Sequence, residues 1–416
     1  MDDVIYCDAA ATTMMSPNCI ETMTNWCNRG NPSSAYASAN EAKKMIANFR
    51  RYIAKICDFD LQDYKVIFTS GATESNCMII LSAIRSYTAF TGYVPHIIIS
   101  AVEHNSIIKF CDSLKNERIL EYTAVPIRKI KNGYGTVNPI DIQYAIKPNT
   151  CLISIMSANN ETGIINNIVG IGQLAHDSNV PFHTDAVQIF GKSPIMPDAM
   201  NIDAFSVSFH KIHGPPGVGM LVIKSRFING YNIQAHIAGT QNEGLRGGTE
   251  NLPGLAASFA ALKETMSRRN EKNTKQRFLR TMFLNGVADK IQCVNIINYN
   301  NKLVTPTDEP IIVFIMPIID EQPVIPSIIL LSVFRKRFCN KAARRSLEEN
   351  GIIVSVGSAC NTSHNEPSHV IKALEIPDEL SRCILRISFS DNLGRNDMKR
   401  LIKKFVEVIM SDTCLF

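Results

Sequence analysis

Six short runs rich in Val and Ile alternate with helix-like segments in the first half of the chain, and this alternation limits the fold more than any other feature. The runs lie at residues 65–69, 96–100, 151–156, 180–185, 204–209 and 219–224. The segment 41–56, by contrast, repeats apolar residues such as Met45, Phe49 and Ile53 at helical spacing. Such alternation predicts an α/β fold on a mostly parallel sheet. A charged helix near residue 265 opens a second region, for which we predict a smaller α+β domain.

Composition and charge exclude several classes of protein. The 416 residues are 45% hydrophobic and 19% charged, which is ordinary for a globular protein with a large core. The net charge of +5 is mild and comes without long runs of like charge, so direct nucleic-acid binding is not predicted. Prolines and acidic residues interrupt the most hydrophobic stretch, 310–334, before it reaches the about 18 residues that span a membrane. The N-terminus carries no basic and apolar leader, so we expect a cytoplasmic protein.

The twelve cysteines are scattered along the chain, with no Cys-x-x-Cys pair and no histidine at a spacing typical of zinc sites. We therefore predict neither a disulfide framework nor a metal site, and expect most cysteines to be small buried side chains. Cys360 differs, because the surrounding Gly, Ser, Asn, Thr and His residues have the composition of a loop. A thiol in such a loop is either incidental or takes part in chemistry.

Polar residues cluster where the predicted strands end, which is where open α/β sheets bind ligands. The first cluster, Ser-Gly-Ala-Thr, follows the run 65–69 and opens a predicted helix. The amides of Gly71, Ala72 and Thr73 could hold a phosphate at that helix N-terminus, although the same residues also form an ordinary helix cap.

Two further clusters supply a carboxylate and an amine. Asp185 ends one apolar run, and its burial requires a cation, either a structural arginine or the protonated ring nitrogen of a cofactor. Ser208, His210 and Lys211 end another run. A lysine there is usually a solvated surface residue, but here it accompanies a carboxylate and a phosphate cradle. Pyridoxal 5′-phosphate (PLP) requires these three elements, for its aldehyde, its pyridine nitrogen and its phosphate, so Lys211 is predicted to carry PLP covalently.

Ten stretches, in one order along nearly the whole chain, resemble the cysteine desulfurases (NifS/IscS-like) of the class V aminotransferase group, which are fold-type I PLP enzymes. The stretches are DAAATT (8–13), NPSSA (31–35), FTSGATESN (68–76), EHNS (103–106), NNETG (159–163), HTDAVQ (183–188), SFHKIHGPPGVG (208–219), GLRGGTEN (244–251), VGSAC (356–360) and EPSHVIKAL (366–374). The resemblance implies a large domain, residues 15–262, on a mostly parallel seven-stranded sheet. It also implies a smaller α+β domain, residues 1–14 and 263–416, which carries the catalytic cysteine loop.

The resemblance implies a role for each matching position. His104 would stack over the PLP ring and take part in proton transfer, and Asp185 would hold the ring nitrogen. The phosphate ligands would be Gly71, Ala72, Thr73, Ser208 and His210, with Thr249 reaching the phosphate of the other subunit of a homodimer. Asn160 and Gln188 would lie near the ring hydroxyl, and the substrate would meet Asn31, Asn160 and Arg386, the last as the clamp of its carboxylate.

Cys360 would be the catalytic cysteine. The implied reaction converts L-cysteine to L-alanine and leaves a persulfide on Cys360, whose sulfur then passes to an iron–sulfur scaffold or tRNA-thiolation partner. Two alternatives stay open. A selenocysteine lyase or related aminotransferase would share the PLP site without depending on Cys360, and a degenerate scaffold protein would not bind PLP covalently.

Some positions depart from the family pattern. Phe209 stands where the family usually has a small residue, Pro216 stands where a lysine is common, and CNTSHN (360–365) replaces a more typical Cys-Thr-Ser start. The residues after Arg386, SFSDNLGRND, also differ from the usual continuation, and the segment 295–350 is longer than usual. These departures bear on rate and on the choice of partner more than on the reaction.

Overall fold

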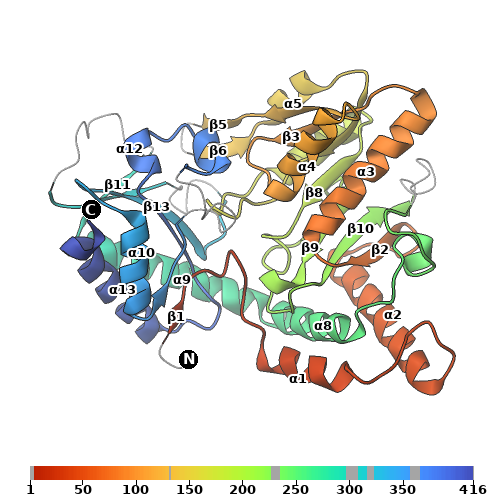
Figure 1. The fold of residues 1–416 in the computed structure, drawn as a ribbon, viewed down its shortest axis with the longest axis horizontal. Helices are drawn as coiled ribbons and strands as arrows, with labels where there is room; N and C mark the ends of the chain where they lie inside the picture. The colour runs from red at the N-terminus through yellow and green to blue at the C-terminus, as the bar shows by residue number, and fades with distance from the viewer. Residues whose placement is uncertain are drawn as a thin grey trace.

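The structure is a computed structural model that describes residues 4–130, 133–225, 235–296, 308–315, 323–356 and 366–415. Its two larger sheets have seven and four strands and lie side by side, each with helices packed on it (Figure 1). Cavities, clusters and ion pairs are described below for this part of the chain.

The larger sheet has the strand order β2-β10-β9-β8-β7-β3-β4. Neighbouring strands run parallel except that β10 runs antiparallel to both β2 and β9. The bounds are β2 (Tyr64–Thr69), β10 (Gly219–Lys224), β9 (Ala204–Ser208), β8 (Phe182–Asp185), β7 (Thr150–Ser154), β3 (His96–Ser100) and β4 (Glu121–Val125). All six runs singled out in the sequence form strands of this sheet, which confirms the predicted mostly parallel seven-stranded sheet.

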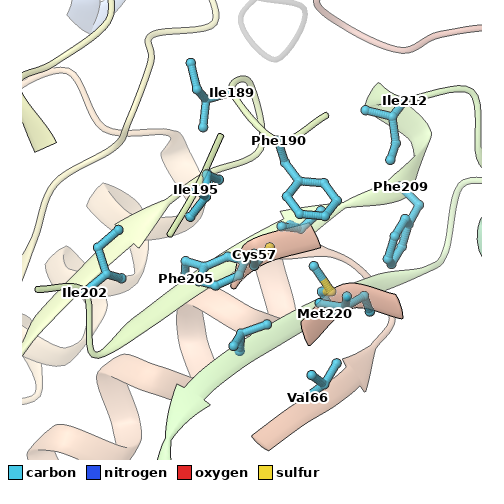
Figure 2. Packing of buried hydrophobic residues seen from close by; sticks show 14 of the residues in the cluster. Cys57, Val66, Ile189, Phe190, Ile195, Ile202, Phe205, Phe209, Ile212 and Met220 are labelled. Atoms are coloured by element: carbon cyan, nitrogen blue, oxygen red, sulfur yellow. The ribbon is translucent and has the colours of Figure 1, made fainter. Parts of the chain in front are cut away.

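Helices cover both faces of this sheet because alternate side chains of each strand point to opposite faces. In β2, Val66 and Phe68 belong to one core, and Ile67 belongs to the other. The first core also takes in α2 (Ala37–Cys57), α5 (Pro139–Ala145), α6 (Ile168–Asp177) and α8 (Leu252–Ser267). The second core takes in α3 (Ala72–Thr91) and α4 (Asn105–Asn116). Figure 2 shows part of the first core, where Phe205 and Met220 pack beside Phe190 and Phe209.

The smaller sheet has the order β11-β12-β13-β15, with β11 and β12 parallel and the other pairs antiparallel. Its strands are β11 (Gln292–Asn295), β12 (Ile311–Phe314), β13 (Ile328–Phe334) and β15 (Ile384–Ser388). One face packs on α9 (Arg269–Ala288), α10 (Asn340–Glu349) and α13 (Arg395–Met410). The other face packs on α11 (His369–Ala373), on α12 (Asp378–Ser381) and on Val102 and Met156, which follow β3 and β7. The larger and smaller sheets are therefore joined by an apolar core.

Short elements complete the connections. β1 (Ile5–Tyr6) pairs in parallel with β14 (Ile352–Ile353), which places this strand on the side of the smaller sheet. The chain then crosses to the larger sheet, where α1 (Pro17–Trp26) packs on α8 (Figure 1). The remaining elements are the hairpin β5 (Ile127–Ile130) and β6 (Gly133–Val137) and the 3-10 turns η1 (Phe209–Lys211), η2 (Asn242–Gly244) and η5 (Asp412–Cys414).

The described residues contain neither a membrane-spanning helix nor a metal-binding cluster. None of the helices described is long and apolar enough to cross a bilayer. The described His, Cys, Asp and Glu side chains form no group of three or more that could hold a metal ion.

Candidate active site

A cavity of about 390 Å³ lies where the parallel strands of the larger sheet end and the N-terminal residues cross over them. Loops after β2, β3, β7, β8 and β9 contribute to its wall, and β15 of the smaller sheet adds Arg386. The predicted site residues in the wall are Gly71, Ala72, Thr73, His104, Asn160, Asp185, Gln188, Ser208, His210, Lys211 and Arg386. The structure thus brings together side chains that are up to about 300 residues apart in the sequence.

Lys211 lies in η1, directly after β9, because the chain must turn there before it returns as β10. Its Nζ donates hydrogen bonds to the carbonyl oxygens of Ala10, at 2.7 Å, and Ala11. Within the described chain, no carboxylate lies within ion-pairing distance of it. Burial, helped by the positive charge of Arg386, lowers the pKa of Lys211 to about 7. A substantial fraction of the amine is therefore uncharged near neutral pH and able to act as a nucleophile or a base.

Asp185 ends β8 and is 5% exposed. One carboxylate oxygen accepts a hydrogen bond from Asn76 Nδ2 at 2.9 Å, and the other accepts one from the backbone N–H of Val187 at 3.0 Å. Among the described residues no arginine forms an ion pair with it. The structural arginine that the sequence left open as its partner is therefore not observed, and Asp185 remains available to a cation in the cavity.

The N-terminus of α3 opens onto the same cavity. Its N-cap, Gly71, makes no side-chain capping bond, so the amides of the first turn point at the cavity wall without a side-chain acceptor. Ser208 lies across from Gly71. A side chain on Gly219 would place its Cβ 2.5 Å from the backbone of Gly71, so only glycine at this position allows β10 to lie so close to the start of α3. A helix N-terminus whose first amides have no side-chain acceptor favours the binding of an anion.

Two histidines complete the polar wall. His210 is oriented by a 3.0 Å hydrogen bond between its Nδ1 and Thr12 Oγ1, and burial lowers its pKa to about 4. His104 is the N-cap of α4, where it accepts the backbone N–H of Ser106. Burial also lowers the pKa of His104, against the opposing effect of the Asp185 charge. Both rings are therefore mainly neutral at physiological pH.

Arg386 is 1% exposed and extends from β15 toward the cavity. Its Nη1 donates to the carbonyl oxygen of Asn160 at 3.0 Å, and its Nη2 pairs with Asp8 at 2.6 Å. Its Nε is buried and has no hydrogen-bond partner in the described structure. A guanidinium that lines a cavity suits a substrate carboxylate. Nearby, Gln188 Nε2 donates to the carbonyl oxygen of Ala10 at 3.1 Å, which ties it to the segment that also holds Lys211.

Three predicted residues do not line this cavity. Asn31 is exposed and accepts the backbone N–H of Ser33. Thr249 is also exposed, although Arg246 fastens its segment to Glu74 in the first turn of α3 by a 2.7 Å ion pair. Cys360 lies outside the described residues. A single chain therefore does not test the roles predicted for these three positions.

The residues on either side of the cysteine segment are anchored at the cavity. Before it, Ser355 forms a two-way backbone bridge with Arg386. After it, the Ser368 hydroxyl donates to Glu161 Oε2 at 2.7 Å, and His369 Nε2 lies 2.8 Å from the backbone oxygen of Glu103. The described residues on either side of Cys360 in the sequence therefore contact the cavity wall.

Sequence reasoning missed several residues that shape the site, namely Asp8, Asn76, Ser106, Glu161 and His369. All five lie within the quoted stretches, so their positions were visible, but their contacts join distant parts of the chain. Their role follows from packing and not from local spacing.

The described groups fit PLP in charge and kind. Lys211 offers a partly buried amine without a carboxylate partner, Asp185 a carboxylate held in place by two donors, and α3 an N-terminus without a side-chain cap facing Ser208. The cavity of about 390 Å³ is also in the range of small-molecule sites. This combination of fold and site is that of a fold-type I PLP enzyme.

The chain belongs to the class-V aminotransferase family, whose model matches residues 5–401. It is 32% identical over 412 residues to the cysteine desulfurase IscS of Clostridium botulinum, covering 98% of this chain and 95% of that protein. A solved NifS-like protein superposes with a TM-score of 0.80 at 26% identity, covering 97% of this chain and 99% of the other. A structure described as SspA in complex with cysteine superposes with a TM-score of 0.72 at 28% identity, over 92% and 98% of the two chains. The protein therefore belongs to a family of enzymes, and nearly its whole length is related to cysteine desulfurases.

Proposed function

We propose that this protein is a PLP-dependent cysteine desulfurase that converts L-cysteine to L-alanine and carries the sulfur as a persulfide on Cys360. The observation that carries the proposal is the cavity that holds a partly buried amine at Lys211, a strand-end carboxylate at Asp185 and a buried guanidinium at Arg386. The relatives named as cysteine desulfurases, and the related structure with cysteine bound, support the same substrate.

Each charged or polar group of the cavity would have its own role in binding PLP and substrate. Arg386 would bind the substrate carboxylate through its guanidinium, which lines the cavity. Asp185 would keep the pyridine nitrogen protonated, while the first turn of α3, with Ser208 and His210, would hold the phosphate. When bound, PLP supplies an electron sink that makes the Cα proton of an amino acid removable. Lys211, with its pKa near 7, is then the best-placed base for that proton.

Sulfur transfer requires a second nucleophile. The thiolate of Cys360 would attack the sulfur of the substrate, so that an S–S bond forms, the Cβ–S bond breaks, and the carbon skeleton leaves as L-alanine. Ser355, which bridges to Arg386, and Ser368, which bonds to Glu161, flank Cys360 in the sequence, and both contacts support a role for this thiol in the reaction.

The partners are proposed at a coarser level. An active homodimer is supported by Thr249 and Asn31, which are exposed and outside the chain's own cavity although both match site positions. The sulfur acceptor would be an iron–sulfur scaffold or a tRNA-thiolation protein. The cytoplasmic location stays a prediction.

Mass spectrometry after addition of L-cysteine tests the proposal directly. We expect one added sulfur atom on the peptide that contains Cys360, together with equal amounts of alanine and sulfide in the presence of a reductant. Cys360→Ala should keep PLP and lose sulfide release, whereas Cys27→Ala, at an exposed cysteine away from the cavity, should retain it. Sulfide release at the wild-type rate by Cys360→Ala would favour the lyase or aminotransferase alternative. A protein that fails to bind PLP would favour the scaffold alternative.

A further inference from the structure

A chain of hydrogen bonds connects Asp185 to the ring of His104. Asn76, on α3, uses both hydrogens of its amide nitrogen: one bonds Asp185 Oδ2 at 2.9 Å and the other bonds Ser106 Oγ at 3.0 Å. Ser106 lies on α4, and its hydroxyl oxygen is 2.9 Å from His104 Nδ1. The backbone nitrogen of Ser106 is 3.1 Å from the same Nδ1. The two residues thus couple the two predicted contacts of the PLP ring.

These contacts determine which ring nitrogen of His104 carries the proton. The backbone N–H of Ser106 can only donate, so Nδ1 must accept. The Ser106 hydroxyl already accepts from Asn76, and its own hydrogen is free to point at Nδ1. A proton on Nδ1 would place donor against donor at the backbone bond, so a neutral His104 carries its proton on Nε2.

The orientation of Asn76 is also determined. Rotating its amide by half a turn would place Oδ1 against the carboxylate of Asp185, which can only accept. Asn76 is fully buried, and its Oδ1 has no hydrogen-bond partner in the described structure. The amide therefore keeps this orientation although it leaves one buried oxygen unsatisfied. An unsatisfied buried oxygen indicates that the two donated bonds decide the arrangement.

Burial, and not the surrounding charges, favours the neutral ring of His104. Lys211, on η1, opposes protonation, and Asp185, on β8, favours it. His210 and His369 also interact electrostatically with the ring. Burial is the largest influence and lowers the pKa of His104. Since Nδ1 faces its own helix and His104 lines the cavity, Nε2 is the nitrogen left for a ligand.

We propose that Asn76 and Ser106 are positioning residues that hold His104 as its neutral Nε2–H tautomer, so that His104 acts on the cavity's ligand as a hydrogen-bond donor and not as a proton acceptor. Such a donor would stabilise negative charge on a substrate sulfur or carboxylate. The removal of a substrate proton then falls to Lys211. The inference rests on the proposed function only in taking an amino acid as that ligand.

Nitrogen-15 NMR of histidine-labelled protein tests the tautomer without any turnover. The signals of His104 are assigned by their loss in His104→Asn, in the PLP-loaded protein and after PLP is removed. At alkaline pH we expect an unprotonated Nδ1 and a protonated Nε2 in both forms. A proton on Nδ1 with a bare Nε2 would overturn the proposal.

Titration of the same signals tests the two positioning residues. Ser106→Ala removes one of two donors to Nδ1, so the pKa of His104 should rise by about 0.5 to 1 pH unit, the equivalent of one hydrogen bond. Asn76→Ala should act in the same direction, because the Ser106 hydroxyl is then free to accept. Ser106→Thr should restore the wild-type value. Ser113→Ala, on the outer part of the same helix, should leave it unchanged.

The acid limb of sulfide release should not follow the pKa of His104 in Ser106→Ala, because a protonated His104 keeps its Nε2–H donor. An acid limb that moves with that pKa and returns in Ser106→Thr would indicate a proton acceptor and would overturn the donor role. A His104 pKa that both Ser106→Ala and Asn76→Ala leave unchanged would refute the role of the two residues. A protein with the expected tautomer but no sulfide release would refute the proposed function alone. Sulfide release with a proton on Nδ1 would refute only this inference.

Discussion

Two lysines, Lys211 and Lys272, line cavities next to the Ala9–Ala11 segment, and they differ in whether a carboxylate pairs with them. In the described part of the chain, the amine of Lys211 donates to the backbone carbonyls of Ala10 and Ala11 and to no carboxylate. Lys272 of α9, by contrast, forms a 2.9 Å ion pair with Asp391. Lys211 borders both spaces, but the one beside Asp391 measures about 30 Å³ and the one beside Asp185 about 390 Å³. The larger space has room for an organic ligand, and the smaller one has room for little more than a water molecule.

Asp391 is surrounded by donors from several segments. Its carboxylate accepts from His213 Nε2 at 2.8 Å, from Lys272 Nζ at 2.9 Å and from Gln276 Nε2, while its backbone oxygen accepts from Lys275. Burial alone would raise the pKa of Asp391, but the His213 bond and the Lys272 charge outweigh it and hold the pKa well below its usual range. Burial therefore makes a lysine amine reactive where no carboxylate forms an ion pair with it, as at Lys211. Where a carboxylate does so, as at Lys272, the amine serves the structure instead.

Replacing the two lysines gives the largest expected contrast. Lys211→Ala should remove the covalent attachment of PLP and lower activity by about 10²–10⁴-fold or more, the usual scale for losing a general base. Lys272→Ala should keep PLP and most of the activity while losing stability. The measurement is borohydride reduction with L-cysteine turnover, and peptide mapping should place the reduced adduct on Lys211. An adduct on another lysine would mean that the unpaired amine has been assigned wrongly.

Removing Asp391 should affect folding more than chemistry. Asp391→Ala leaves Lys272 and His213 without their acceptor, so we expect a loss of about 3 kcal/mol in the free energy of unfolding, as for a broken buried pair. Glu348→Ala breaks the exposed pair with Arg344 and should cost no more than about 0.5 kcal/mol. Denaturant titration of both variants measures the contrast. Equal effects would show that the Asp391 junction is no more stabilising than a surface pair.

The same junction has a defined pH dependence. The folded pKa of Asp391 lies below its unfolded value of about 3.9, so its contribution is present above that value and is lost as the pH falls toward the folded pKa. The stability difference between the wild type and Asp391→Asn should therefore shrink as the pH is lowered from 5 toward 2. A difference that stays constant over this range would contradict the pairing.

The same contrast explains what the sequence could predict. The strands follow from local runs of β-branched residues, and Asp185 and Lys211 follow from strand ends, so both were placed by local patterns. The bond between Arg386 and Asp8 joins residues 378 apart, and that between His213 and Asp391 joins residues 178 apart, distances at which no periodicity carries information. The antiparallel course of β10 was likewise not evident from its composition. The division at residues 15–262 stays a prediction, because the structure shows two sheets joined by a shared apolar core.

The last prediction concerns the uncharged state of Lys211 in the protein from which PLP has been removed. Covalent attachment of PLP requires the neutral amine, so its rate should be nearly constant above pH 7 and fall about tenfold per pH unit below it, since the pKa is about 7. A lysine with the usual pKa of about 10.4 would instead show a rate that keeps rising to pH 10. Arg386 is the second cause of the lowered pKa, so Arg386→Gln should raise it and move the whole curve to higher pH. Stopped-flow absorbance during PLP rebinding measures both curves, with Lys272→Ala as the control that should leave the curve in place. If the rate of the wild-type protein continued to rise beyond pH 9, Lys211 would be as well paired as Lys272, and the difference between the two lysines would disappear.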